Sequence, residues 1–273
     1  MRIICSLTTI PSRLPRLEKT IDSLLDQTVL PDKIYIHIPI VYNFRFAGTK
    51  VNQDIINLFL ARYANYKDIV VFHTVAKDQG PGTKLLGFFN TPEWGDAATK
   101  DTDDFVLVVD DDVKYPNTFI QTYINNILLN GVGAKKVYTF QNYDIKNLDE
   151  RDKIYVGMCV AGFCINVKFL RDFPAFFEKV GKYDFVLYHD ELYMSYYAGK
   201  LQGLEIENIS NGSSYTVIEN TYVDALNQIR GAYKRETITP HILEVFDRYY
   251  PHVLAGSGKN GATTPVKRSF KLF

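Results

Sequence analysis

The sequence predicts an α/β protein in which helices cover both faces of a mostly parallel sheet. Over residues 1–112, short apolar segments alternate with segments of helical periodicity in the order β-α-β-α-β-α-β. Such alternation is typical of parallel strands joined by crossover helices. The chain has 273 residues, 46% of them hydrophobic, which is enough apolar material for one large domain of this class.

Four strands and three helices account for the first half of the chain. Residues 3–10 form an apolar run that Pro11 ends, and residues 33–38 alternate in polarity until Pro39. Leucine and isoleucine recur at helical spacing over residues 13–27, between these two strands. The sequence further predicts a helix at 53–63, a strand at 69–73, a Gly/Pro turn at 78–83, a helix from Lys84, a polar loop at 91–103 and a strongly apolar strand at 105–109.

The second half is less regular. The sequence predicts helices at 115–129, 167–180 and 188–198, and strands at 136–140 and 204–209. Residues 155–167 are apolar with two glycines, which fits either one strand or a hairpin. After Pro251 the composition changes to Gly, Ser, Lys and Thr, and we expect a partly mobile tail there.

Composition and charge argue against several classes of protein. The 31 basic and 31 acidic residues balance, so the net charge gives no indication of a nucleic-acid partner. Cys5, Cys159 and Cys164 form no CxxC pair, and we expect reduced thiols in a soluble, cytoplasmic protein rather than disulfides or a zinc site. Residues 1–10 are too short and too polar for a signal peptide, and no apolar stretch approaches the roughly 18 residues of a membrane span.

Three consecutive aspartates follow the strand at 105–109. Carboxylates at the end of a buried strand repel one another, and a fold accepts that cost when a cation lies among them. Mg²⁺ and Mn²⁺ prefer such oxygen ligands and share them with substrate phosphates. Because side chains alternate along a strand, we expect Asp110 and Asp112 to hold the metal while Asp111 points elsewhere or meets a ribose. The alternative is a solvated acidic turn without a ligand.

Four segments resemble those of the GT-A glycosyltransferases. FVLVVDDD at 105–112 resembles their DxD motif, and SLTTIPSR at 6–13 resembles their nucleotide-binding opening. DQGPGTK at 78–84 is similar to a D-x-G-P-x-x-K segment of small enzymes of this type, and HDE at 189–191 is similar to their late acidic motif. The small GT-A enzymes encoded by chlorella viruses are the most similar of these, which implies a role in glycan synthesis in the host cytoplasm.

The resemblance implies a binding pocket for the nucleotide at the first strand. Thr8, Thr9, Pro11 and Arg13 would line the site of the base and ribose, with Asp111 also on the nucleotide. Arg13 would pair with a phosphate through its planar guanidinium, unless it is a surface residue at a helix start.

Two residues of the Gly/Pro turn would also contact the donor. Asp78 would contact the base or, alternatively, bond the backbone of its own turn. Lys84 would offer its charge to the diphosphate or the sugar, unless it is a solvated helix residue.

The remaining implied roles concern the metal, the base and the acceptor. The fold often has a late histidine as third metal ligand, for which His241 is the first candidate and His252 the second. Asp190 would act as the general base, with Glu191 as its substitute, although both carboxylates would also suit the first turn of a helix. Trp94 would stack on an acceptor sugar or simply pack.

Together these residues predict a metal-dependent, inverting glycosyltransferase. It would move a sugar from a UDP-sugar donor, xylose first and L-rhamnose next, to a hydroxyl of a glycan acceptor. We predict one GT-A domain over residues 1–255, with a nucleotide-binding half at about 1–115, an acceptor half at about 116–255 and a tail at 256–273. A retaining transferase and a catalytically weak carbohydrate-binding protein remain as alternatives. A phosphatase of the haloacid dehalogenase type is disfavoured because DDDVKY lacks its threonine, and a nucleotidyltransferase because SLTTIPSR lacks glycine.

Overall fold

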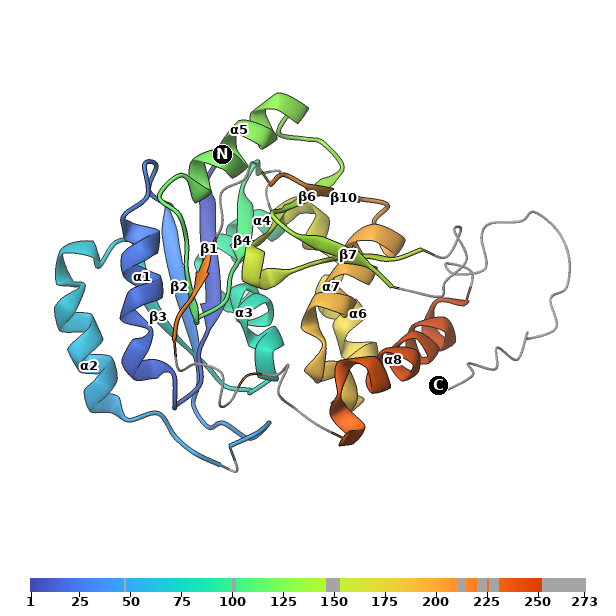
Figure 1. Cartoon of the computed structure of the whole chain (residues 1–273), viewed down its shortest axis with the longest axis horizontal. Helices are drawn as coiled ribbons and strands as arrows, with labels where there is room; N and C mark the ends of the chain where they lie inside the picture. Colours follow the sequence, from blue (N-terminus) through green and yellow to red (C-terminus); the bar gives the residue numbers. More distant parts are fainter. Residues whose placement is uncertain are drawn as a thin grey trace, which may run out of the picture.

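A seven-stranded sheet forms the centre of the molecule in the computed structural model (Figure 1). The structure describes residues 1–46, 48–99, 102–145, 153–210, 215–219, 225 and 231–251, with backbone alone for 96–99 and 231. The strand order is β10-β6-β9-β4-β1-β2-β3, so that β4 lies in the middle. The strands are β1 Ile3–Thr8, β2 Lys33–Pro39, β3 Val70–Val75, β4 Phe105–Val108, β6 Lys136–Thr139, β9 Phe163–Asn166 and β10 Glu205–Asn208.

The sheet is mostly parallel. β1 pairs in parallel with β2 and β4, β2 with β3, and β6 with β10. β9 runs antiparallel to both of its neighbours, β4 and β6. Two small ribbons lie outside this sheet: β5 Val113–Lys114 with β11 Thr216–Val217, and β7 Asn142–Asp144 with β8 Tyr155–Gly157. The predicted fold class, a mostly parallel sheet flanked by helices, is confirmed.

Each face of the sheet has its own hydrophobic core, because successive side chains of a strand point to opposite faces. On one face, Ile4, Val106 and Ile165 pack with α3, α6, α7 and α8. On the other, Cys5, Leu107 and Cys164 pack with α1, α2 and α5. The α-helices are α1 Glu18–Leu25, α2 Gln53–Arg62, α3 Thr83–Leu86, α4 Pro92–Thr99, α5 Phe119–Asn130, α6 Phe173–Val180, α7 Asp190–Tyr196 and α8 Arg235–Tyr249.

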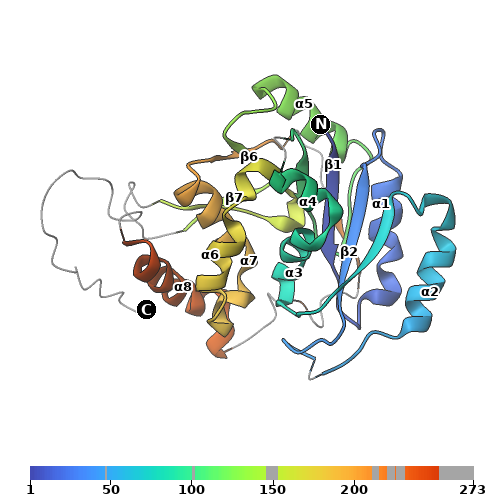
Figure 2. The ribbon, with the colours of Figure 1, turned by 180° about the vertical axis from the view of Figure 1, so that it is seen from behind.

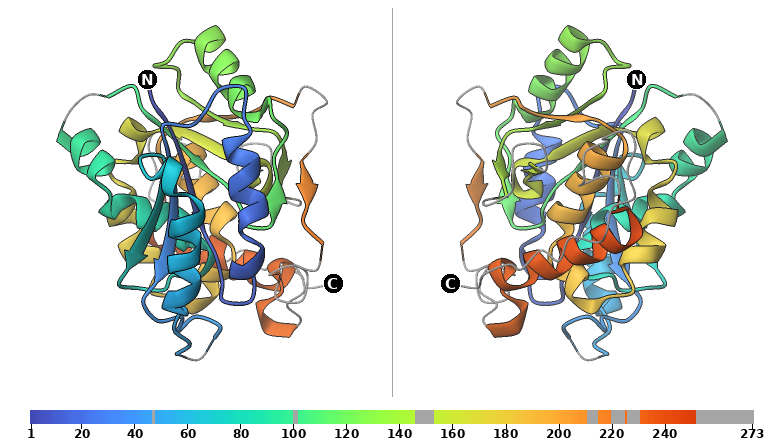
Figure 3. Two further views of the ribbon diagram at one scale, coloured as in Figure 1. Left: turned by 90° about the vertical axis from the view of Figure 1, so that its left-hand side faces the viewer. Right: turned by 90° about the vertical axis from the view of Figure 1, so that its right-hand side faces the viewer.

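Different helices lie at the two ends of the molecule's long axis. Seen from the front and from behind, α2 lies at one end and α8 at the other (Figures 1 and 2). In the right half of Figure 3, α8 lies in the foreground, across the end that is remote from α1 and α2. Short 3₁₀ segments cover 14–16, 64–66, 80–82, 87–90, 159–161, 167–170, 184–188 and 231–233, and a π-helical turn covers 197–201.

Several predictions of local structure were wrong. The predicted loop at 91–103 contains α4, which Thr91 precedes and Pro92 begins. The helix predicted from residue 115 begins at Phe119, because Val113–Lys114 forms a strand and Pro116 follows it. Residues 155–167 form two strands in different sheets rather than one strand or a hairpin. The helix predicted at 167–180 is a 3₁₀ turn followed by α6.

Two further predictions concern the cysteines and the membrane. Cys5, Cys159 and Cys164 are all free thiols, as predicted, and the structure shows that all three are buried. In the described ranges, none of the helices has the length and apolar character to cross a bilayer.

Candidate active site

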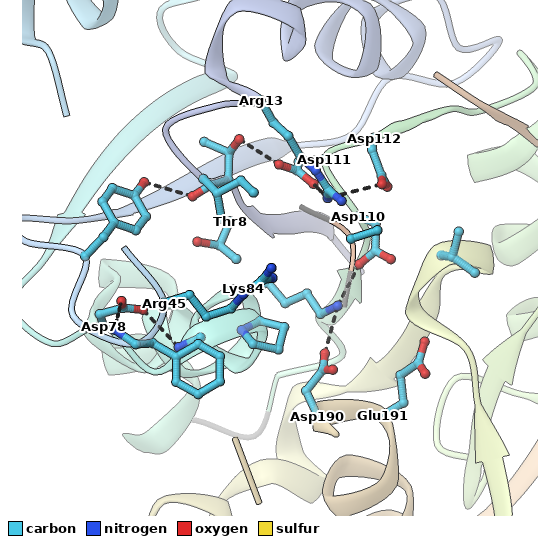
Figure 4. Close-up of a pocket in the computed structure, with 18 of the residues that line it drawn as sticks. Thr8, Arg13, Arg45, Asp78, Lys84, Asp110, Asp111, Asp112, Asp190 and Glu191 are labelled. Carbon is cyan, nitrogen blue, oxygen red and sulfur yellow. Dashed lines mark hydrogen bonds and ion pairs between the residues drawn. The ribbon is translucent and has the colours of Figure 1, made fainter. Parts of the chain in front are cut away.

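A cavity of about 250 Å³ opens at the edge of the sheet where β1 and β4 end (Figure 4). In open α/β sheets, ligands bind at this carboxyl edge of the strands. Both halves of the chain contribute to its walls: Thr8, Thr9, Ile10, Arg13, Tyr42, Phe44, Arg45, Phe46, Asp78, Gly80, Pro81, Lys84, Asp110, Asp111, Asp112, Met158, Val160, Asp190, Glu191, Val217, Ala225 and Arg235. Among the residues predicted for the site, Pro11, Trp94 and His241 are not in this lining.

Asp111 and Asp112 are tied to the end of β1. Asp111 accepts a hydrogen bond from Thr9 Oγ1 at 2.7 Å and one from Arg13 Nη1 at 2.8 Å, one on each carboxylate oxygen. The same Arg13 nitrogen lies 3.1 Å from Asp112 Oδ2. Burial opposes the charge of Arg13, but Asp111 and Asp112 raise its pKa. Both oxygens of Asp111 are therefore engaged by protein groups, whereas Asp110 and Asp112 have oxygens that face the cavity.

Lys84 joins the aspartate cluster to α7. Its Nζ lies 2.6 Å from Asp110 Oδ1 and 2.8 Å from Asp190 Oδ2 (Figure 4). The Lys84 side chain is only 5% exposed and that of Asp190 only 1%. Burial alone would lower the pKa of Lys84, yet Asp110 and Asp190 hold it well above its usual value. Lys84 is thus a buried, charged bridge across the cavity.

A chain of hydrogen bonds behind the cavity holds the backbone of Lys84. Ser6 Oγ donates to the Lys84 carbonyl, so this hydroxyl must accept from His37 Nε2, which is 2.9 Å away. Burial, followed by the neighbouring His73, lowers the pKa of His37 to about 3, so its ring is neutral and has one N–H. His37 Nδ1 must then accept from His73 Nδ1, at 2.9 Å. Both histidines, which lie within β2 and β3, support Lys84 and are not in the cavity lining.

Asp190 and Glu191 begin α7, but their surroundings differ. Glu191 Oε1 accepts from the Cys159 backbone N–H at 3.1 Å, and Oε2 accepts from Arg235 Nη1 at 2.9 Å. Burial and the adjacent Asp190 raise the pKa of Glu191, while Arg235 opposes this rise. Both Glu191 oxygens are therefore occupied by protein donors. Arg235 is a cavity residue that the sequence analysis missed, because nothing local marks it and its partner lies 44 residues earlier.

The described lining has six carboxylates and four cationic side chains, a formal excess of two negative charges. This excess is concentrated at the aspartates: burial, Asp111 and Asp110 raise the pKa of Asp112 to about 7. A divalent cation would relieve that repulsion, and carboxylate oxygens are the donors that Mn²⁺ and Mg²⁺ prefer, so the residues fit the metal. In the described ranges, no group of three or more His, Cys, Asp or Glu side chains is arranged to hold a metal. The remaining ligands would have to come from elsewhere, such as substrate phosphates.

The other predicted nucleotide residues have structural bonds as well. Thr8 lines the cavity and donates its hydroxyl to the His37 carbonyl at 2.7 Å. Asp78 accepts from the N–H of Phe44 at 2.8 Å and from that of Gly80 at 2.9 Å, so it does bond its own turn while it lines the cavity. Gly80 has φ +59°, and a Cβ there would lie 2.7 Å from the Phe44 ring, so this turn requires glycine.

Two predictions about single side chains are not supported. His241 lies on α8 with its side chain 60% exposed, and its Nδ1 is 3.7 Å from Glu244 Oε2. It is absent from the cavity lining, so the structure gives no support to His241 as third metal ligand. Trp94 packs edge-on against Phe89, with ring centroids 4.6 Å apart, and is also absent from that lining. His252 and the tail at 256–273 lie outside the described residues.

Comparisons with known proteins give distant structural similarities. No protein-family model and no curated protein matches the chain. Among solved structures, it is similar to S. aureus TarS 1-349, at TM-score 0.40 and 13% identity over 64% of this chain and 49% of that one. It is also similar to GalNAc-T7 with UDP, GalNAc and Mn²⁺ (TM-score 0.45, 12% identity, 80% of this chain and 44% of that one). For HddC from Yersinia pseudotuberculosis the TM-score is 0.41 at 11% identity, over 89% of this chain and 99% of that one.

The chain spans about half the length of the TarS and GalNAc-T7 chains.

Proposed function

We propose that this protein is a metal-dependent glycosyltransferase that moves a sugar from a UDP-sugar to a hydroxyl of a glycan acceptor. One observation carries the proposal: Asp110, Asp111 and Asp112 follow the central strand β4 after Val109 and line one cavity with the Lys84–Asp190 pair. This arrangement offers a site for a cation, a positive charge for a diphosphate and a carboxylate for an acceptor hydroxyl within a single enclosure.

The donor would lie over the ends of β1 and β4. Thr8 and Thr9 would line the base and ribose, and Arg13 would keep Asp111 and Asp112 in place beside them. Mn²⁺ or Mg²⁺ on Asp110 and Asp112 would supply charge stabilisation to the departing diphosphate. The resemblance to chlorella-virus enzymes favours UDP-xylose as donor, then UDP-L-rhamnose, and implies a reaction in the cytoplasm.

In the inverting reaction, the acceptor oxygen bonds to C1 of the sugar while the bond from C1 to the β-phosphate oxygen breaks. UDP leaves with the electron pair of that bond, and Asp190 takes the proton from the acceptor hydroxyl. Asp190 suits this role because it lines the cavity and is fixed there by its ion pair with Lys84. Glu191 is instead a positioning residue, since the Cys159 N–H and Arg235 hold both of its oxygens.

A hydrolysis assay tests the proposal. The protein is incubated with a panel of UDP-sugars and Mn²⁺, and released UDP is measured with and without EDTA. We expect slow, Mn²⁺-dependent hydrolysis of one or two UDP-sugars, abolished in Asp112→Asn and unchanged in Asp26→Asn, which replaces an exposed carboxylate outside the cavity. Hydrolysis that is absent, or that is equal in Asp112→Asn and wild type, would contradict the proposal.

A further inference from the structure

Three aromatic rings form a continuous row from the cavity to the surface. The Phe44 and Tyr188 ring centroids are 4.4 Å apart, and Tyr188 stacks on Tyr233 at 4.5 Å with 28° between the ring planes. Phe44 lines the cavity, and Tyr233 is 42% exposed. The rings come from the loop after β2, the 3₁₀ segment 184–188 and the 3₁₀ segment 231–233, so the fold brings together three distant parts of the chain.

Core packing does not account for the outer ring. The large tyrosines that serve the core, such as Tyr123, Tyr138 and Tyr196, are less than 2% exposed. Tyr233 stacks on Tyr188 and keeps 42% of its surface exposed, so part of this residue can be reached by a flat, apolar partner.

The row lies next to the residues that would carry out the transfer. Tyr188 precedes Asp190 by two residues, and Tyr233 precedes Arg235 by two. Arg235 Nη1 in turn lies 2.9 Å from Glu191 Oε2. The chain therefore ties Tyr188 and Tyr233 to the side of the cavity that carries the proposed base. Thr9 and Arg13, which are proposed to face the nucleotide, instead contact the aspartates at the end of β1 and β4.

A pyranose has the surface that such a row would recognise. Its axial C–H groups make one ring face apolar, while its hydroxyl groups point outward in the plane of the ring. Binding sites for such amphipathic ligands combine aromatic side chains with a few placed polar groups, which Asp190 and Arg235 would supply here. The rings would hold the sugar without fixing which hydroxyl reacts, and the polar groups would select that hydroxyl.

We propose that Tyr233, backed by Tyr188 and Phe44, forms the acceptor subsite and binds a pyranose unit of the glycan acceptor by stacking. The proposal rests on the transferase function proposed above and adds the position and the chemical class of the acceptor. Tyr233 is a specificity residue in this scheme, not a catalytic one, because it packs against the sugar and transfers no proton.

Saturation-transfer NMR tests the subsite independently of catalysis. The probes are methyl β-D-glucopyranoside, methyl β-D-xylopyranoside and methyl α-L-rhamnopyranoside, each added to the protein with UDP and Mn²⁺. We expect saturation of the C–H protons on one face of at least one probe, with binding about fivefold weaker in Tyr233→Ala and retained in Tyr233→Phe. Tyr66→Ala is the matched control. Tyr66 is 40% exposed and lies before the amino end of β3, whereas the cavity opens at the carboxyl ends of β1 and β4.

The possible outcomes separate this inference from the function on which it rests. Equal saturation in wild type and Tyr233→Ala, or no saturation of any probe by the wild type, would overturn the subsite. A loss of UDP affinity in Tyr233→Ala would also overturn it, because the row would then serve the donor. UDP and Mn²⁺ binding by the wild type, measured in the same samples by calorimetry, reports separately on the proposed function.

Discussion

Replacing Lys84 by methionine should destabilise the protein through the two carboxylates that it leaves behind. The substitution keeps the length of the side chain but removes a charge that lies 2.6 Å from Asp110 and 2.8 Å from Asp190. The Asp110 side chain is 26% exposed and can be hydrated, whereas that of Asp190 is only 1% exposed. Most of the cost should therefore fall on Asp190.

Breaking a buried ion pair by removing one partner costs about 3–5 kcal/mol. At about 2 °C per kcal/mol for a chain of this size, the melting temperature should fall by roughly 6–10 °C. The double variant Lys84→Met/Asp190→Asn removes the stranded charge, so it should regain about 2 kcal/mol relative to Lys84→Met alone.

Equilibrium unfolding in urea at pH 7 measures these differences, with Lys19→Met as a control at an exposed lysine. The control should stay within about 0.5 kcal/mol of the wild type. Two results would contradict the stabilising role of the charged bridge. One is a free energy of unfolding for Lys84→Met within about 0.5 kcal/mol of the wild type. The other is a double variant that is less stable than Lys84→Met alone.

Two further predictions concern the proposed base and the buried histidine. Asp190→Asn should lower the rate of sugar transfer by about 10²–10⁴-fold while its affinity for UDP and Mn²⁺ stays unchanged. Glu191→Gln should retain more activity. Near-normal turnover by Asp190→Asn would remove this residue from the mechanism. Because the pKa of His37 is lowered from 6.5 to about 3 by burial and then by His73, the unfolded chain binds more protons than the native one between these values. The stability from neutral His37 is complete above pH 6.5 and declines as the pH falls, by about 2 kcal/mol at pH 5. Histidine NMR should show no protonation of His37 in the native state down to pH 5, and a midpoint near 6.5 would contradict the hydrogen-bond chain to Ser6.

Strand positions could be predicted from the sequence because buried strands are apolar runs with clear ends. β1, β2 and β4 are such runs, and the residues that follow them meet at one edge of the sheet for a topological reason. The direction of β9 could not be predicted, since nothing within Phe163–Asn166 distinguishes a parallel from an antiparallel neighbour. Helix α4 was missed because its composition is polar, although Thr91, Pro92 and Glu93 are typical of a helix start.

Site residues could be predicted where they lie next to a strand or within a recognisable motif. They could not be predicted where tertiary contacts alone place them at the cavity. Lys84, Asp110 and Asp190 belong to segments that the sequence singles out, and they meet in the structure. Arg235 and Phe44 carry no local signal, and the fold alone brings them to the cavity. His241 was chosen for its residue type, but the face of α8 that it occupies was not predictable from so weakly amphipathic a helix.

The central claim is that the aspartates after β4 hold a nucleoside diphosphate through a divalent cation. Calorimetric titration of UDP into the protein, with Mn²⁺ and then with EDTA, tests it most directly. We predict saturable binding with Mn²⁺ that is lost in EDTA and in Asp112→Asn, and retained in Asp26→Asn. UDP binding that is as tight in EDTA as in Mn²⁺, or no binding under either condition, would contradict the claim.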